Sequence, residues 1–187
     1  MFLKNFLTHS EKWLYKKRSN KEIFRIVFAF FCSFQLLIYL LSFLTEIFLG
    51  NGLSFFASDE NLTYNFNLLI TLPLFFFLLA LREEIFFRLP IVLFLHKKIG
   101  FHLKLILVLI LQVLFTLVHY SENNNLWFTF VPAFISGLLF SIIFIISGSN
   151  EKKYIKALVI VTLYHTLQNI FVGLPKITYD IFSNLLT

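Results

Sequence analysis

The sequence predicts an all-α fold, a polytopic transmembrane helical bundle with about five core spans and an N-terminal interfacial helix. Three observations lead to this prediction. Hydrophobic residues make up 58% of the 187-residue chain. Charged residues make up only 14%, against roughly 25% in soluble domains. The apolar residues also fall in long charge-free blocks, which are typical of membrane spans and not of an amphipathic soluble fold.

Five blocks are long enough to cross the hydrocarbon, which takes roughly 20 residues at about 1.5 Å of helix rise each. The second block differs from the others because it continues through a charged patch, Arg82 to Arg88. The five blocks are expected at about Ile26 to Thr45, Asn65 to Leu95, His102 to Tyr120, Leu126 to Ile146 and Tyr154 to Phe171.

The residues before the first block predict a different kind of helix. Phe2, Phe6, Trp13 and Leu14 lie among lysines there, which is the pattern of an amphipathic helix that rests in the membrane interface. The chain is therefore expected to have three parts: an interfacial segment at 1–22, a transmembrane bundle at 23–175 with its chemically active core at about 70–173, and a C-terminal tail or partial helix at 176–187.

The connections between the blocks differ in charge. Lysines occur in the N-terminal arm, in residues 96–104 and in residues 151–156, whereas residues 51–61 and 121–125 contain no Lys or Arg. By the positive-inside rule, the N-terminus is expected to face the cytoplasm of a bacterial plasma membrane. Topology thus explains the net charge of +6, so membrane lipids are expected partners and nucleic acid is not.

The second block contains charges that need an explanation, because each costs at least ~2.5–3.5 kcal/mol at a helix centre within the bilayer. Glu84 and Arg88 are four residues apart, so they share one helix face and can form an ion pair. Glu83 points about 100° away around the helix. It is therefore the carboxylate that is freer to meet water or a substrate.

Two later blocks carry histidines at a matching depth. His119 ends the third block, and His165 and Asn169 lie four apart on the fifth. If the chain turns near Gly100 and near Asn150, these groups reach the same level of the bundle as the two glutamates, at ~1.5 Å per residue. Polar side chains from three helices are therefore expected to meet in one layer.

Such a cluster suits hydrolysis of an acyl bond. A carboxylate in apolar surroundings can take a proton from water near neutral pH. His119 can hold that water against Glu83, while His165 and Asn169 offer donors for an oxyanion.

At these positions the sequence resembles the CAAX prenyl protease and bacteriocin-processing (CPBP) family of intramembrane proteases. The resemblance covers about residues 70–173, with three motifs in the family's order on successive core helices. These motifs are Glu83-Glu84-x-x-x-Arg88, Phe115-x-x-x-His119 and His165-x-x-x-Asn169.

The resemblance implies an intramembrane endopeptidase that hydrolyses a peptide bond of a membrane-associated or lipidated protein or peptide. Such a substrate at the membrane is therefore an expected partner. The implied roles are Glu83 as general base with His119, Glu84 and Arg88 as supports of the site, and His165 with Asn169 as donors that stabilise the tetrahedral intermediate.

Metal dependence stays open at this point, and no cofactor is assigned. The chain has no H-E-x-x-H motif, so zinc would need ligands from separate helices. In that case the expected ligands are Glu84, His119 and His165.

Three other interpretations compete with catalysis. Glu84 and Arg88 can serve only to fix helix register. The same fold can also act as a non-catalytic immunity or regulatory scaffold that binds a peptide or partner. Finally, intramembrane Glu and His also build proton relays, although the chain lacks the repeat symmetry of transporters. Replacing Glu83 by Gln separates these interpretations, because the shape survives while the base is lost.

Overall fold

The computed structural model describes residues 2–49, 66–119 and 126–186, with side chains over 5–40, 73–119, 131–149 and 151–171. All regular structure in these residues is helical, which confirms the predicted fold class. The elements are α1 (Phe2–Tyr15), α2 (Asn20–Leu49), α3 (Phe66–Leu95), α4 (Phe101–Val118), α5 (Leu126–Ile146), the short 3-10 turn η2 (Ser149–Glu151) and α6 (Tyr154–Leu186).

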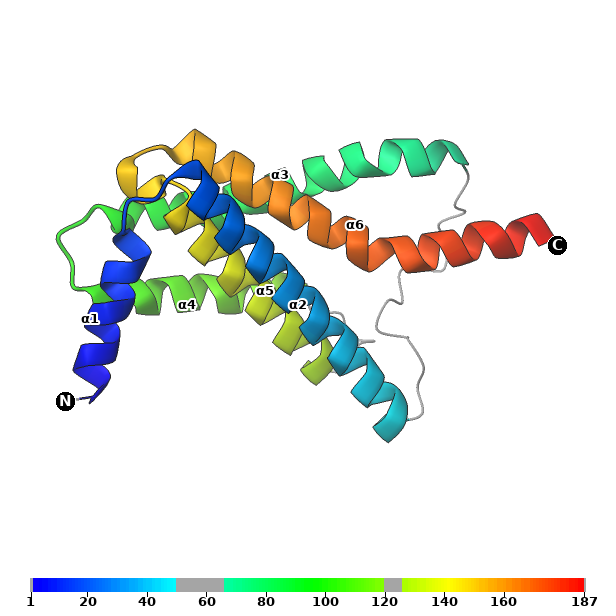
Figure 1. Cartoon of the computed structure of the whole chain (residues 1–187), viewed down its shortest axis with the longest axis horizontal. Coiled ribbons are helices and arrows are strands. Elements are labelled where there is room, and N and C mark those ends of the chain that lie inside the picture. Colours follow the sequence, from blue (N-terminus) through cyan, green and yellow to red (C-terminus); the bar gives the residue numbers. More distant parts are fainter. Residues whose placement is uncertain (1, 50–65, 120–125, 187) are drawn as a thin grey trace.

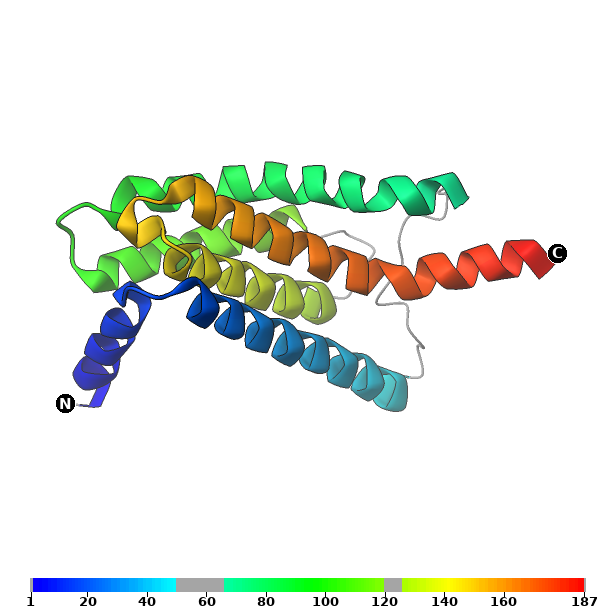
Figure 2. The same ribbon diagram turned by 45° about the horizontal axis from the view of Figure 1, so that its top comes forward.

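Helix α5 lies at the centre of the bundle, where α4 and α6 both pack against it and α3 packs mainly against α6. Helix α2 runs along the outside against α5 and α6, and α1 lies across one end (Figures 1 and 2). Burial follows this arrangement, because Phe140, Ile143 and Phe144 of α5 are essentially inaccessible. Each element contributes apolar side chains to one continuous core, which also contains Ile91, Leu95, Val108, Phe115, Ala157, Val161 and Tyr164.

The turns between the core helices are where the sequence places them. Helix α4 begins after Gly100, and η2 occupies the connection between α5 and α6. Gly148 lies at the start of that connection with φ of 130°, a backbone conformation that residues with a Cβ rarely adopt. Lys152 leaves it in the left-handed region, with φ of 62°.

The basic connections gather at one end of the bundle, as both ribbon views show (Figures 1 and 2). His96 Nε2 lies 3.1 Å from the carbonyl oxygen of Ser149, which joins the two hairpin turns. Lys156 Nζ donates to Asn20 Oδ1 over 2.8 Å and joins α6 to the start of α2. The lysine-bearing segments of the sequence thus form one common face, whose cytoplasmic orientation stays a prediction.

The fifth core helix is longer than the sequence analysis expects. Helix α6 runs without interruption to Leu186 instead of ending near Phe171. The apolar pattern continues at Ile177, Ile181 and Leu185. The helix continues through Pro175, although a proline inside a helix removes a backbone donor and crowds the preceding turn. The expected C-terminal tail at 176–187 is therefore helical as far as Leu186.

The outer faces of the bundle are apolar. Among the described residues, Asn20–Leu40 and Phe101–Val118 are long and apolar enough to cross a membrane, and Val131–Ile146 is apolar but shorter. Large hydrophobic side chains also cover the outside of α3, which a water-soluble surface would not tolerate as a continuous stripe. The exposed side chains on α3 are Leu74, Phe75, Leu78, Ile85, Phe86, Leu89 and Leu93.

A capping box fixes the start of α2. The Ser19 backbone N–H donates to Glu22 Oε2 over 2.9 Å, and the Glu22 backbone N–H donates to Ser19 Oγ over 3.3 Å. This reciprocal pair satisfies two helix-end donors that would otherwise lack partners. The capping box therefore fixes the residue at which α2, the first long apolar helix, begins.

We expect Ser19→Ala to destabilise the bundle by about 1 kcal/mol, because it removes a side-chain cap. Ser33→Ala is the matched control, since Ser33 is an exposed residue within the same helix. Thermal unfolding of the two variants in the same detergent measures the difference. Equal midpoints for both variants would show that the cap does not contribute.

Candidate active site

The site is built on an ion pair inside α3. Arg88 Nε donates to Glu84 Oε2 over 2.8 Å, and both side chains are 0% exposed. The four-residue spacing puts the two groups on one helix face, as the sequence indicates. A charged pair that is completely removed from solvent needs further hydrogen bonds to its remaining polar atoms.

The Arg88 guanidinium receives those contacts from two neighbouring helices. Its Nη1 atom donates to Gln112 Oε1 on α4 over 3.3 Å and to Ser141 Oγ on α5 over 3.1 Å. Its Cζ atom lies 5.5 Å from the ring centroid of Phe115 and 5.6 Å from that of Phe140. Hydrogen bonds and cation–π contacts thus replace part of the water around this cation. Its Nη2 atom is buried and has no hydrogen-bond partner among the described residues.

Gly137 makes the approach of α4 to α5 possible at this level. A Cβ atom at Gly137 would lie 2.5 Å from Gln112 Oε1 and 2.8 Å from Phe115 Cδ1. Gln112 Nε2 in turn donates to Ser141 Oγ over 2.8 Å. The sequence analysis did not single out Ser141. Its signal is the small-x-x-x-small pattern with Gly137, which marks close helix contacts in membrane proteins.

His165 brings α6 into the cluster through the second oxygen of Glu84. Its Nδ1 atom lies 2.8 Å from Glu84 Oε1, and its ring stacks on Phe140 with centroids 4.3 Å apart. Since the carboxylate can only accept, the His165 Nδ1–H donates to it. A carboxylate in this position fixes the tautomer and the orientation of an imidazole, so Nε2 is directed onward.

Glu83 lies between two imidazole rings. Its Oε2 atom is 3.3 Å from His119 Nε2 and 3.6 Å from His165 Nε2, and its side chain is 14% exposed. Within the described part of the chain, this buried oxygen makes no aligned hydrogen bond. His119 is itself oriented, because its Nδ1–H donates to the Phe115 carbonyl oxygen over 2.7 Å.

Five of the six residues singled out by the sequence are thus in one connected cluster, and Asn169 is its neighbour. Asn169 follows His165 by one helical turn on α6 and is partly buried. Among the described residues, its side chain makes no hydrogen bond with the other five. The roles assigned to all six stay predictions.

The polar groups are not arranged as a metal site. In the parts of the chain that the structure describes, no group of three His, Cys, Asp or Glu side chains could hold a metal ion. Glu84 already accepts from Arg88 and His165 with its two oxygens. The conditional zinc set of Glu84, His119 and His165 therefore does not fit this geometry, and no chemical step below passes through a metal.

Comparison with known proteins decides the family. A family model described as Type II CAAX prenyl endopeptidase Rce1-like matches residues 65–171, more than half of the chain. The chain belongs to this family. The match contains every residue of the cluster and confirms the CPBP resemblance seen in the sequence. No curated protein and no solved structure matches the chain.

Membership has two direct consequences. The chain is a membrane protein, in agreement with its apolar helices and their exposed hydrophobic faces. Its family is one of CAAX-type intramembrane endopeptidases.

We expect Arg88→Ala to lower the free energy of unfolding by about 3–5 kcal/mol, because it leaves the Glu84 carboxylate buried without its counter-ion. Arg82→Ala is the matched control, since Arg82 is an exposed arginine on the same helix. Chemical or thermal unfolding in detergent measures both variants. If both substitutions lower the free energy of unfolding by a similar, small amount, the ion pair does not stabilise the bundle as proposed.

We expect Gly137→Ala to destabilise the bundle by about 1–3 kcal/mol, because the added methyl group overpacks the contact between α4 and α5. Gly100→Ala is its control, since a Cβ there meets no atom within 4 Å and the backbone φ is −60°. The same unfolding assay applies. A stability loss at Gly100 that equals the loss at Gly137 is the result that contradicts the close-contact account.

Proposed function

We propose that the protein hydrolyses a peptide bond of a membrane-associated or lipidated protein or peptide, with Glu83 as the general base that activates water. The observation that carries this proposal is the position of Glu83 Oε2. This oxygen is buried, lacks an aligned hydrogen bond among the described residues, and lies 3.3 and 3.6 Å from two imidazole nitrogens. It is thus free to accept a proton from a bound water molecule.

The two neighbouring glutamates differ in what they can do. Both oxygens of Glu84 are occupied by Arg88 and His165, and its side chain is 0% exposed. Glu83 Oε2 has no aligned hydrogen-bond partner among the described residues. The Glu83 side chain is 14% exposed, and that of its neighbour His119 is 33% exposed. A base must reach both water and the scissile carbonyl. Glu83 meets that condition, whereas Glu84 acts as a support that positions His165.

The proposed reaction follows from these positions. Glu83 takes a proton from water as the water oxygen attacks the scissile carbonyl carbon. His119, held by the Phe115 carbonyl, orients the water against Glu83. The C–N bond then breaks, and Glu83 returns the proton to the departing amine nitrogen. The water oxygen and one of its hydrogens end in the carboxyl product, and the other hydrogen ends on the amine product. No further reactant is needed.

The negative oxygen of the tetrahedral intermediate needs donors that are already in place. His165 Nε2 faces the reaction centre because Glu84 holds Nδ1 on the other side of the ring. Asn169 lies one turn further along α6, and its amide can supply a second donor to a bound substrate. We propose these two groups as the oxyanion donors.

Charge balance supports this division of roles. Glu83 and Glu84 carry two negative charges, and Arg88 neutralises one of them. A single imidazolium next to Glu83 brings the buried cluster to neutrality. That imidazolium has N–H groups on both nitrogens, so it can donate to a glutamate and to an oxyanion at the same time.

The family and the surface of the bundle support the proposed substrate class. The family description names CAAX prenyl endopeptidases, and the outer faces of α3 and α4 present apolar side chains. A peptide that is anchored in or at the membrane can therefore reach the cluster from the lipid phase.

We expect Glu83→Gln to lower the cleavage rate by about 10²–10⁴-fold, because it removes the base while keeping the shape. Purified protein in detergent, incubated with prenylated and unprenylated peptide libraries and read by mass spectrometry, provides the measurement. Glu22→Gln is the control, since Glu22 lies at the start of α2 and outside the cluster. Glu83→Gln should retain the thermal midpoint of the unaltered protein.

Three results would contradict this proposal. Full activity of Glu83→Gln would show that Glu83 is not the general base. Specific peptide binding without cleavage, in both the unaltered protein and Glu83→Gln, would identify a non-catalytic scaffold. Loss of cleavage on chelation, with recovery on adding zinc, would show that the reaction needs a metal that the proposed steps omit.

A further inference from the structure

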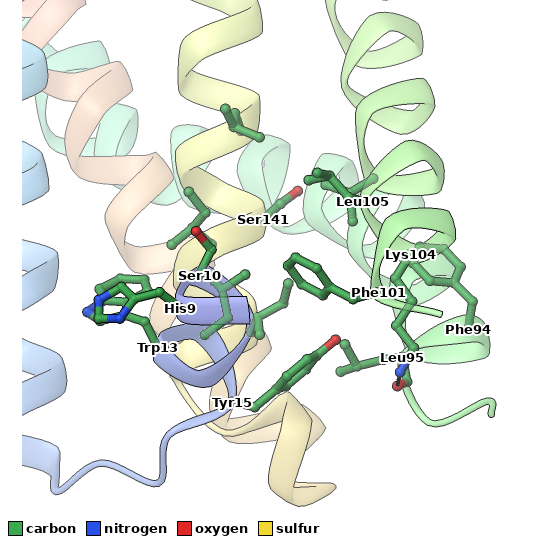
Figure 3. Close-up of a pocket in the computed structure, with 15 residues that line it drawn as sticks. His9, Ser10, Trp13, Tyr15, Phe94, Leu95, Phe101, Lys104, Leu105 and Ser141 are labelled. Atoms are coloured by element: carbon green, nitrogen blue, oxygen red, sulfur yellow. Dashed lines mark hydrogen bonds between the residues drawn. The ribbon is translucent and has the colours of Figure 1, made fainter. Parts of the chain in front are cut away.

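We propose that a cavity beneath α1 binds one hydrocarbon chain of an anionic membrane phospholipid. The cavity has a volume of about 370 Å³ and lies between α1, the end of α3, the first half of α4 and the second half of α5. Figure 3 shows its lining side chains, among them Ser141, Leu105 and Tyr15. This inference concerns binding alone and does not rest on the proposed function.

The cavity has the depth and lining of a chain-binding site. It extends from Phe101 to Val108 on α4 and from Leu138 to Ile145 on α5, or about 10 Å at ~1.5 Å per residue. The hydrocarbon core of a bilayer is ~30 Å thick, so this depth covers much of one leaflet. Because most lining side chains are aliphatic or aromatic, a hydrocarbon chain is favoured there over water.

Part of the cavity lining is polar or basic. His9 and Ser10 of α1 and Lys104 of α4 belong to its lining. Lys104 Nζ donates to the Leu95 carbonyl oxygen over 2.6 Å and lies 5.6 Å from the Tyr15 ring centroid. An ammonium group has three donors, so Lys104 can also donate to a phosphate oxygen.

The N-terminal segment that contains α1 carries excess positive charge. Residues 1–22 contain six Lys or Arg residues and two glutamates. Near an anionic leaflet each basic residue contributes attraction of about 1 kcal/mol. This charge favours an anionic headgroup above the cavity over a zwitterionic one.

The cavity lies behind the catalytic cluster and is separate from it. Ser141 is the lining residue that also contacts Arg88 and Gln112. Glu83 and His165 do not line the cavity. A substrate whose lipid filled this space would therefore enter from the far side of Arg88, away from Glu83. For this reason we assign the cavity to a resident membrane lipid and not to a lipidated substrate.

Photolabelling of the full-length protein tests the assignment. The protein is placed in nanodiscs of phosphatidylcholine and phosphatidylglycerol, with a trace of phosphatidylglycerol that carries a diazirine on its acyl chain. We expect labels on the lining residues Leu105, Val108, Leu138 and Ile142. Leu105→Trp should reduce this labelling by about tenfold, because the larger side chain fills the cavity. Leu114→Trp is the matched control on the exposed face of α4.

Each other outcome overturns the proposal. Labelling that concentrates on the exposed α4 residues Ile106 and Ile110, or that Leu105→Trp leaves unchanged, would show only general lipid contact. Equal labelling by a phosphatidylcholine probe would show that the cavity does not prefer anionic lipids. Displacement of the probe by a farnesylated peptide would assign the cavity to the substrate. Because no peptide is cleaved in this experiment, its result is independent of whether the protein is an active protease.

Discussion

Burying the ion pair between Glu84 and Arg88 inside an apolar bundle obliges every neighbouring core helix to contribute a polar group at the same level. Helix α4 supplies Gln112, α5 supplies Ser141 and α6 supplies His165. The cation and carboxylate would otherwise lose several kcal/mol of hydration without compensation. The register of α3, α4, α5 and α6 is therefore set by one pair of charges, and the residues proposed for catalysis take their positions from that register.

The helices were predictable because the sequence separates apolar blocks from basic connections. Helices α3 and α5 begin and end within one residue of the blocks expected at 65–95 and 126–146. Helix α6 was less predictable, because Pro175 suggests an end that the backbone does not adopt. A proline weakens a helix locally, but whether the helix continues depends on packing and surroundings that a single sequence does not display.

The cluster was predictable where spacing within one helix or equal depth in the bundle indicates a contact. The four-residue spacing indicates the pairing of Glu84 with Arg88, and equal depth indicates that His119 and His165 approach the glutamates. Spacing cannot reveal which side chains meet across helices. The contact of Ser141 with Arg88 and the selection of Glu84 as the partner of His165 depend on helix rotation.

The length of α4 has a consequence for how water reaches the reaction. Helix α4 has 18 residues and is followed directly by His119 at its C-cap, so His119 lies about 27 Å from the basic end at ~1.5 Å per residue. That distance nearly equals the ~30 Å of a bilayer's hydrocarbon. Hydration therefore needs to penetrate only about the last turn of the bundle from the opposite membrane surface, and no aqueous channel along the whole protein is required.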